Sequence, residues 1–376
     1  MAKDKMKKND VQPPHYLCGS RLHNLLLLIR ENGFRIVNRK VPTFMGITMF
    51  NLLMSPIAAI EKAMIRRKIK HLQLEKDPVF ILGHWRSGTT FLINTMSRDR
   101  QFCFFNVVNI MMPNIFMSMG PLINRFAKRI MPKKRPMDNM DLELDLPQEE
   151  DYAVANMVPY SITHMTSFPE NSELYMEYGL QDNLTKEQFD EWQETYQYLL
   201  KKVTLQHNGK QLLLKSPINT GRIKVLLDMY PNAKFVHIYR NPRKVFMSTR
   251  KLYDTVFPLY SLQDAQAPDD DVASFQFKLY KRLYGKYLKQ KHLIPEGNLV
   301  EVRYEDFAEK PLETVEHIYQ AIGIDGFEDA KDDIAAYLAT LKSYKKNVHS
   351  KMKPDEKKRV EKEMDFAIEQ WGYKES

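Results

Sequence analysis

The pattern of apolar and polar residues changes near Pro78. After it, short apolar runs alternate with longer stretches in which apolar residues recur every three or four positions. Four of these runs are predicted strands, at residues 79–82, 211–214, 235–239 and 298–302. Short strands that alternate with helices are typical of parallel strands joined by crossover helices. The sequence therefore predicts an α/β fold of three layers, a central parallel sheet flanked by helices.

The residues before Pro78 follow a helical pattern. After a polar tail that ends at about residue 16, residues 22–74 have few turn signals and are predicted to be helical. We expect two parts, a tail with an N-terminal helical extension over 1–74 and the α/β domain over 75–376.

A long insertion at about 101–207 interrupts the α/β domain. It has a methionine-rich part, an acidic part at 138–151 and a predicted helix at 186–202. Its place in the chain predicts a lid over an acceptor, whereas ordinary core filling also explains the methionines. These methionines are Met111, Met112, Met117, Met119, Met131, Met137 and Met140.

Residues 41–60 form an apolar segment close to the roughly 20 residues that cross a bilayer. Asn51, Ser55 and Pro56 weaken it as a membrane span, and basic residues lie on both sides, at 39–40 and 66–68. We therefore favour a buried or interfacial helix over a span, which leaves open a peripheral contact with a membrane.

The composition of the chain limits the classes of function that it can have. The chain has 376 residues, of which 43% are hydrophobic and 27% charged, as in ordinary soluble proteins. Its net charge of +9 indicates an anionic partner, such as a nucleotide, nucleic acid or acidic membrane, unless the charge is simply solvated. No motif predicts sequence-specific binding of nucleic acid. Two cysteines without metal-ligand spacing, and no secretory signal, favour a reducing cytoplasmic setting.

The first predicted strand runs into a loop that has the frame of a phosphate-binding loop. Gly83 and Gly88 are separated by four residues, and Thr90 stands where G-x-x-x-x-G-K-[ST] has its hydroxyl. Thr89 replaces the lysine that an NTPase places on the β- and γ-phosphates, and the nearest cation, Arg86, lies inside the loop. The loop therefore predicts a P-loop-like fold that holds a phosphate group other than the end of a magnesium–NTP complex.

Polar motifs also follow the other predicted strands. Lys215 follows the second, Arg240 the third, and Tyr304 lies close behind the fourth; Ser248 lies about two helical turns beyond Pro242, a natural first helical residue. Ligands of open α/β sheets bind outside the carboxyl ends of the strands. We expect these motifs to face one site.

These residues carry a family resemblance. The segment from Gly83 to Thr90 resembles the 5′-phosphosulfate loop of the sulfotransferases that depend on 3′-phosphoadenylyl sulfate (PAPS). Arg240 and Ser248 resemble the family's 3′-phosphate motif, and the segment from Tyr304 to Phe307 is similar to one whose tyrosine contacts the nucleotide. Lys215-Ser-Pro217 with 220–223 is similar to bacterial and tyrosylprotein-type members. The resemblance implies these donor-binding residues: Arg86, Ser87, Gly88, Thr89, Thr90, Arg240, Ser248 and Tyr304.

The resemblance also implies a reaction. A sulfuryl group passes from PAPS to an acceptor hydroxyl or amine and leaves adenosine 3′,5′-bisphosphate, without a metal. Arg86 and Lys215 are the candidates to stabilise charge on the bridging oxygen. The predicted acceptor is a small molecule, a glycan or a lipid-like compound.

A hydroxyl acceptor needs a general base. Glu149 and Glu150, in a segment similar to an acidic one of many bacterial sulfotransferases, are the candidates, with a solvated acidic turn as the alternative. The chain lacks the Val-Lys-x-His segment of cytosolic members, and Asn106 occupies the region where the tyrosylprotein type has a glutamate. His84 and His164 are more typical of structural histidines.

Two further functions stay open at this point. One is a P-loop kinase or NTPase, which the missing lysine disfavours; the other is a nucleotide-binding protein without catalysis. Near the C-terminus, Tyr344 with Lys345 or Lys346 is a candidate contact for adenine and the 3′-phosphate, or else a solvated basic helix end, and residues 351–374 are predicted to form a charged helix. The sequence does not predict an oligomeric state.

Overall fold

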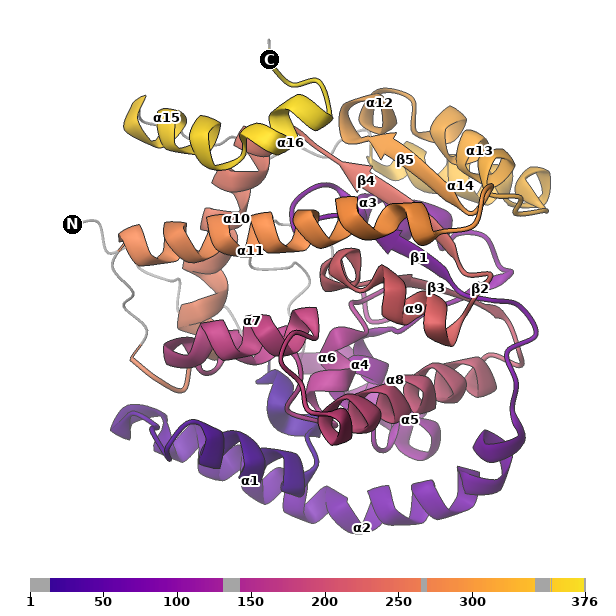
Figure 1. Cartoon of the computed structure of the whole chain (residues 1–376). Helices are drawn as coiled ribbons and strands as arrows, with labels where there is room; N and C mark the ends of the chain where they lie inside the picture. Colours follow the sequence, from indigo (N-terminus) through magenta and orange to yellow (C-terminus); the bar gives the residue numbers. More distant parts are fainter. Residues whose placement is uncertain (1–13, 131–142, 265–268, 342–351, 353, 375–376) are drawn as a thin grey trace.

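A computed structural model gives the fold of the chain (Figure 1). It describes residues 14–130, 143–264, 269–341, 352 and 354–374. Of the predicted features, Met131, Met137, Met140, part of the acidic segment, and Tyr344, Lys345 and Lys346 lie outside the described residues.

Five parallel strands form one sheet with the order β2-β3-β1-β4-β5. The central strand β1 pairs with β3 on one side, Ile81 opposite Lys215, and with β4 on the other, Leu82 opposite His237. The four predicted strands are present within one residue of their expected bounds. The bounds are β1 (Val79–Leu82), β2 (Phe102–Cys103), β3 (Gln211–Lys215), β4 (Lys234–Tyr239) and β5 (Leu299–Arg303).

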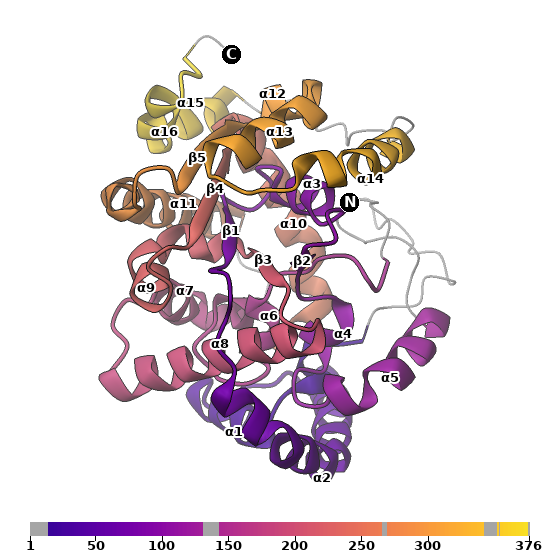
Figure 2. The same ribbon diagram turned by 90° about the vertical axis from the view of Figure 1, so that its right-hand side faces the viewer.

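Helices cover both faces of the sheet, which confirms the three-layer α/β prediction (Figures 1 and 2). Alternate side chains of β1 enter two separate cores, Val79 and Ile81 on one face and Phe80 and Leu82 on the other. The first core is closed by α3 (Thr89–Met96), α12 (Tyr304–Glu309), α13 (Pro311–Ala321) and α14 (Phe327–Thr340). The second, larger core includes α8 (Lys186–Gln206), α9 (Ile223–Met229), α10 (Pro242–Tyr260) and α11 (Asp269–Gln290).

The segment at 101–207 begins with the edge strand β2, which the sequence pattern did not predict. Its helix α8 includes all of the predicted 186–202, and Met111 and Met117 pack against the larger core. The remaining helices of this segment are α4 (Val107–Met111), α5 (Phe116–Ile130), α6 (Asp151–Ala155) and α7 (Ser172–Leu180).

The N-terminal helices are α1 (Leu22–Glu31) and α2 (Val41–His71), which confirms the predicted helical extension. Leu25, Leu28 and Ile29 of α1 are buried in the larger core. Helix α2 runs along the outside of the molecule, next to α1 (Figure 1). Residues 38–71 are long and apolar enough to cross a membrane, yet only 11% of their most apolar 18-residue window is buried. A buried helix, one of the two favoured interpretations of this segment, is therefore wrong, because only Ile47 and Asn51 are buried between residues 41 and 60.

The C-terminal segment forms two short helices instead of one charged helix, α15 (Pro354–Glu363) and α16 (Asp365–Gln370). Met364, between them, is fully buried. Beyond α16, the ring of Trp371 stacks on Tyr239 at the end of β4, with centroids 5.4 Å apart. The C-terminus thus closes over the edge of the sheet near the ends of β4 and β5.

Candidate functional site

The loop between β1 and α3 has an unusual backbone. Gly83, Arg86 and Gly88 have φ of 142°, 70° and 108°, a region that costs an arginine energy but suits glycine. The amide of Gly83 donates to Oγ1 of Thr220 at 2.8 Å. Gly88 precedes the first turn of α3, where Thr89 and Thr90 lie. The helix N-terminus and the turned backbone together suit an anion.

The side chains expected to bind one nucleotide lie together. Arg86 Nε donates to Oγ of Ser248 on α10 at 2.8 Å. Arg240 Nη1, just beyond β4, donates to the carbonyl oxygen of Arg86 at 3.1 Å. The guanidinium of Arg240 also lies 4.2 Å from the ring centroid of Tyr304, the first residue after β5. Three of the four motifs that were expected to face one site, those after β1, β4 and β5, therefore meet at the loop.

Tyr304 packs closely on the loop. A Cβ at Gly88 would lie 2.3 Å from Cδ2 of Tyr304, a distance that real atoms do not adopt. Glycine is therefore required here for contact as well as for its positive φ.

Three buried polar atoms of the loop and of the residues around it have no hydrogen-bond partner: Nε2 of His84, Oγ of Ser87 and Nε of Arg240. Buried polar groups are nearly always paired, so these atoms are available to a ligand that enters the cluster. A hydroxyl and a guanidinium both donate to phosphate oxygens. The cluster therefore fits the phosphate groups of a nucleotide such as PAPS.

Lys215, the last residue of β3, forms an ion pair with one of the two candidate bases. Its Nζ lies 2.8 Å from Oε1 of Glu149, which precedes α6. The Lys215 side chain is 3% exposed and that of Glu149 is 20% exposed. Glu149 is therefore partly exposed, whereas Lys215 is buried.

Glu150 lies in a different environment. It is fully buried, and its Oε1 accepts from Nδ2 of Asn219 at 2.5 Å and from the hydroxyl of Tyr196 at 3.1 Å. Burial raises its pKa to about 7, although its hydrogen bonds act in the opposite direction. Its Oε2 has no partner. Glu150 does not reach the surface in this structure, so the adjacent glutamates are not equivalent.

The next residue, Asp151, connects this segment to Arg222, which follows β3. No sequence motif predicted this contact. Its carboxylate pairs with Nη1 of buried Arg222 at 3.0 Å and accepts from the hydroxyls of Ser161 and Thr163. Nε of Arg222 donates to the carbonyl oxygen of Gly179. The segment at 220–223, which carried part of the family resemblance, is the only signal in the sequence that could have identified Arg222.

Comparisons with known proteins agree with this geometry. A sequence model described as "Sulfotransferase family" matches residues 78–329, about two thirds of the chain. The chain belongs to the sulfotransferase family. Two curated proteins, from Mycobacterium bovis and Mycobacterium tuberculosis, are each 28% identical over 349 residues, 92% of this chain and 88% of theirs. Both are named omega-hydroxy-beta-dihydromenaquinone-9 sulfotransferase Stf3.

Solved structures confirm the fold of this sulfotransferase. The sulfotransferase STF9 from Mycobacterium avium superposes with a TM-score of 0.66 at 12% identity, over 94% of this chain and 97% of that one. STF1 from M. tuberculosis H37Rv superposes with a TM-score of 0.63 at 14% identity, over 84% and 86%.

The histidines near the site of the sulfotransferase are buried. His84 and His164 have no exposed surface, and burial lowers the pKa of each to about 4. Nδ1 of His84 lies 2.8 Å from the carbonyl oxygen of Trp85, and Nδ1 of His164 lies 3.2 Å from the hydroxyl of Tyr16. Both are therefore neutral near pH 7. Among the described residues, no three His, Cys, Asp or Glu side chains are arranged to hold a metal ion.

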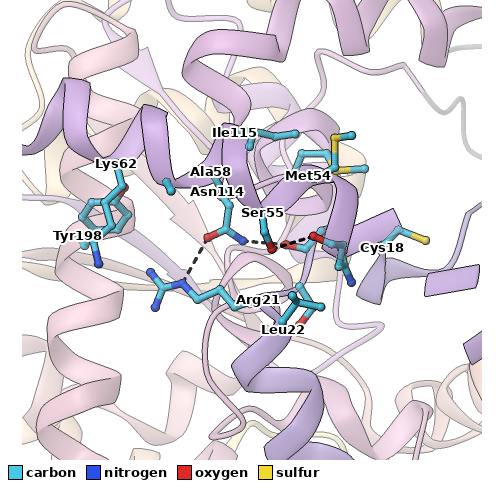
Figure 3. Close-up of a pocket in the computed structure, with 15 residues that line it drawn as sticks. Cys18, Arg21, Leu22, Met54, Ser55, Ala58, Lys62, Asn114, Ile115 and Tyr198 are labelled. Carbon is cyan, nitrogen blue, oxygen red and sulfur yellow. Dashed lines mark hydrogen bonds between the residues drawn. The ribbon is translucent and has the colours of Figure 1, made fainter. Parts of the chain in front are cut away.

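A pocket of about 200 Å³ lies apart from the loop, among the N-terminal helices (Figure 3). Arg21 and Lys62 supply positive charge to it, and Nε of Arg21 donates to Oδ1 of Asn114 at 3.3 Å. Tyr198 of α8 lines the same side as Lys62. No sequence motif singled out this pocket.

Proposed function

We propose that this sulfotransferase transfers the sulfuryl group of PAPS to a hydroxyl of a lipid-like acceptor. The observation that carries the proposal is the contact of Arg86 with Ser248 and of Arg240 with both the loop and Tyr304. These groups come from three strand ends, and a single nucleotide with phosphates at both its 5′ and its 3′ side accounts for all of them.

In this proposal the loop holds the 5′ end of the donor. Its amides, with Ser87, Thr89 and Thr90, donate to the phosphosulfate, and the unpaired Oγ of Ser87 supports this role. Arg240 and Ser248 hold the 3′-phosphate and so select this donor over ATP, which has no phosphate there. Tyr304 packs against the nucleotide.

The chemical step needs a base for the acceptor hydroxyl and a cation for the leaving phosphate. The acceptor oxygen forms a bond to sulfur as the bond from sulfur to the bridging oxygen of the 5′-phosphate breaks. Glu149 takes the proton of the acceptor hydroxyl, while Arg86 and Lys215 stabilise the charge left on the phosphate. Adenosine 3′,5′-bisphosphate and the sulfated acceptor leave, so atoms and charge balance without a metal.

Glu149 is the better base because it is partly exposed, whereas Glu150 is enclosed by Asn219 and Tyr196. We assign Glu150 a positioning role. Its bonds to Asn219, four residues beyond Lys215, and to Tyr196 of α8 fix the start of α6, and therefore the place of Glu149 beside Lys215.

The proposed acceptor class follows from the curated relatives, whose name gives a hydroxylated menaquinone derivative. A lipid-like molecule with a terminal hydroxyl is the corresponding acceptor here. The proposed setting is the cytoplasm, at or near a membrane that holds such a molecule.

The donor is tested by ligand-induced shifts of the melting temperature. Adenosine 3′,5′-bisphosphate should stabilise the protein without magnesium, by about 2.7 kcal/mol at a hundredfold excess over its Kd. Arg240→Ala should remove most of this shift, whereas Arg100→Ala, on an exposed side chain paired with Asp333, should retain it. Stabilisation by Mg-ATP in preference to the bisphosphate would refute the donor and favour a kinase or NTPase.

The reaction itself is tested by mass spectrometry of hydroxylated lipids incubated with PAPS and enzyme. We expect a sulfated product together with adenosine 3′,5′-bisphosphate in equal amounts. Tight binding of the bisphosphate without transfer to any hydroxylated lipid or amine would instead indicate a nucleotide-binding protein without catalysis.

A further inference from the structure

Large apolar side chains are exposed mainly at one end of the molecule. Of the twelve that are exposed among the described residues, eleven belong to α1, α2, α5 or the link after α1, and only Leu293 lies elsewhere. These three helices lie at the same end in both views (Figures 1 and 2). Six of them form what we call the α2 face: Met45, Met49, Leu52, Leu53, Ile60 and Met64. An exposed apolar surface of this extent marks an interaction site.

The opposite side of α2 is fastened to the protein. Asn51 Nδ2 donates to the carbonyl oxygen of Leu17 at 2.8 Å. Glu61 pairs with buried Lys202 of α8 at 2.5 Å and also accepts from Ser118. Removal of α2 from the body would leave Lys202 as a buried unpaired cation, which is costly. The helix therefore presents its apolar face while it stays attached, unlike a helix that crosses a bilayer.

The exposed charges of residues 38–71 are all positive. The only acid between residues 38 and 71 is Glu61, which is buried against Lys202. Seven cations flank the apolar stripe, and one of them, Arg39, pairs with Asp264. They are Arg39, Lys40, Lys62, Arg66, Arg67, Lys68 and Lys70. Basic residues at both ends of an exposed apolar stripe match a surface that is apolar inside and anionic outside.

We propose that α2 docks the enzyme on an anionic lipid bilayer, with the helix parallel to the membrane and the α2 face inserted among the acyl chains. At 1.5 Å per residue its 31 residues extend about 46 Å along the surface. The cations then lie at the level of the headgroups, where each strengthens binding. This inference rests on the proposed function in one respect only, because a lipid-like acceptor gives the enzyme a reason to bind a membrane.

Vesicle co-sedimentation of the full chain tests the docking without donor or acceptor. Vesicles of phosphatidylcholine with phosphatidylglycerol should sediment the protein, pure phosphatidylcholine much less, and added salt should weaken the binding. The double variant Met49→Glu/Leu53→Glu should bind at least about tenfold more weakly, because two charges would enter the acyl layer. Both residues are exposed, so the fold should persist, which an unchanged melting temperature would verify.

The matched control is Leu293→Glu, the same change on the exposed apolar side chain outside this end, and its vesicle binding should equal that of the wild type. Arg66→Glu/Arg67→Glu should abolish the preference for anionic lipid. Wild-type vesicle binding by the α2-face variant would overturn the proposal. So would retention in vesicles after alkaline carbonate extraction, which indicates a span, or a dimer in solution that Met49→Glu/Leu53→Glu dissociates.

A water-soluble hydroxylated acceptor separates this inference from the proposed function. The α2-face variant should turn it over at the wild-type rate but lose activity toward an acceptor embedded in vesicles. Equal losses on both acceptors would show that the helix is needed for the fold or the site, and the docking proposal would fail. Vesicle binding in an enzyme inactive on every acceptor would leave docking supported and refute only the sulfuryl transfer.

Discussion

The buried carboxyl of Glu150 should make the stability of the protein depend on pH. Its pKa is about 7 in the folded protein, against an ordinary value of 4.5, and the largest cause is its burial. Because the folded state binds this proton more tightly, the resulting stability is complete below pH 4.5. It is lost as the pH rises through 7. The difference in pKa corresponds to about 3 kcal/mol.

The test variant is Glu150→Gln, which keeps the shape of the side chain and removes the titration. Its carbonyl can still accept from Asn219 and Tyr196, but its amide nitrogen would occupy the place of Oε2, which has no partner. The protonated carboxyl of the wild type has the same kind of unpaired donor at Oε2, so the amide resembles the neutral form of Glu150. Near pH 5 the variant should therefore be about as stable as the wild type. By pH 8 the variant should be the more stable, by up to about 3 kcal/mol, because the wild type has lost its proton-linked stability.

Urea unfolding at a series of pH values between 5 and 8 measures this difference, with tryptophan fluorescence, to which fully buried Trp192 contributes, as the signal. Trp192 stacks on Tyr196, so it reports on the helix that holds Glu150. Glu313→Gln, on a side chain that is 71% exposed, is the control and should show no comparable trend. A stability difference between Glu150→Gln and wild type that stays constant from pH 5 to 8 would refute the reasoning. It would mean that Asn219 and Tyr196 stabilise the buried carboxylate fully.

Three further predictions concern the donor and the base. Arg86→Ala should lower kcat about 100-fold or more in a sulfated-product assay, because the charge on the leaving phosphate loses a fixed cation; wild-type turnover would exclude Arg86 from the site. Glu149→Gln should lower kcat about 100-fold while the Kd for adenosine 3′,5′-bisphosphate, measured by calorimetry, stays within twofold; full activity would show that another group is the base. Gly88→Ala should weaken that binding about tenfold because its Cβ displaces Tyr304, whereas Gly285→Ala, where a Cβ meets nothing within 4 Å, should not; equal Kd values would contradict the packing argument.

The arrangement of the sheet could be predicted because the sequence signals of its strands are local. Each of the four predicted strands is a short apolar run, and the polar motif that follows it marks its carboxyl end. Parallel pairing then brings Arg86, Arg240 and Tyr304 to one edge. The strand β2 has only two residues and so leaves no alternating pattern to detect.

The environment of the glutamates could not be predicted, because it depends on contacts between distant residues. Glu150 meets Tyr196 and Asn219, which are 46 and 69 residues away, and nothing local distinguishes it from Glu149. The same limit applies to α2. Its apolar composition suits burial and a membrane surface equally, and only the packing of Asn51 and Glu61 shows which side faces the protein.

The proposed docking helix and the proposed base are joined through α6. The amide nitrogen of Arg21 donates to the carbonyl oxygen of Asn156, and Asn24 donates to that of Ala155, so the N-terminal segment holds the far end of α6. Glu149 and Glu150 stand at its near end, and five helical residues span only about 8 Å. A membrane bound by α2 would therefore lie on the side of α6 that is opposite to Glu149 and Lys215. The N-terminal extension that carries α2 is therefore fastened to the helix next to the proposed base, so a docked α2 would hold the site at a fixed distance from the membrane.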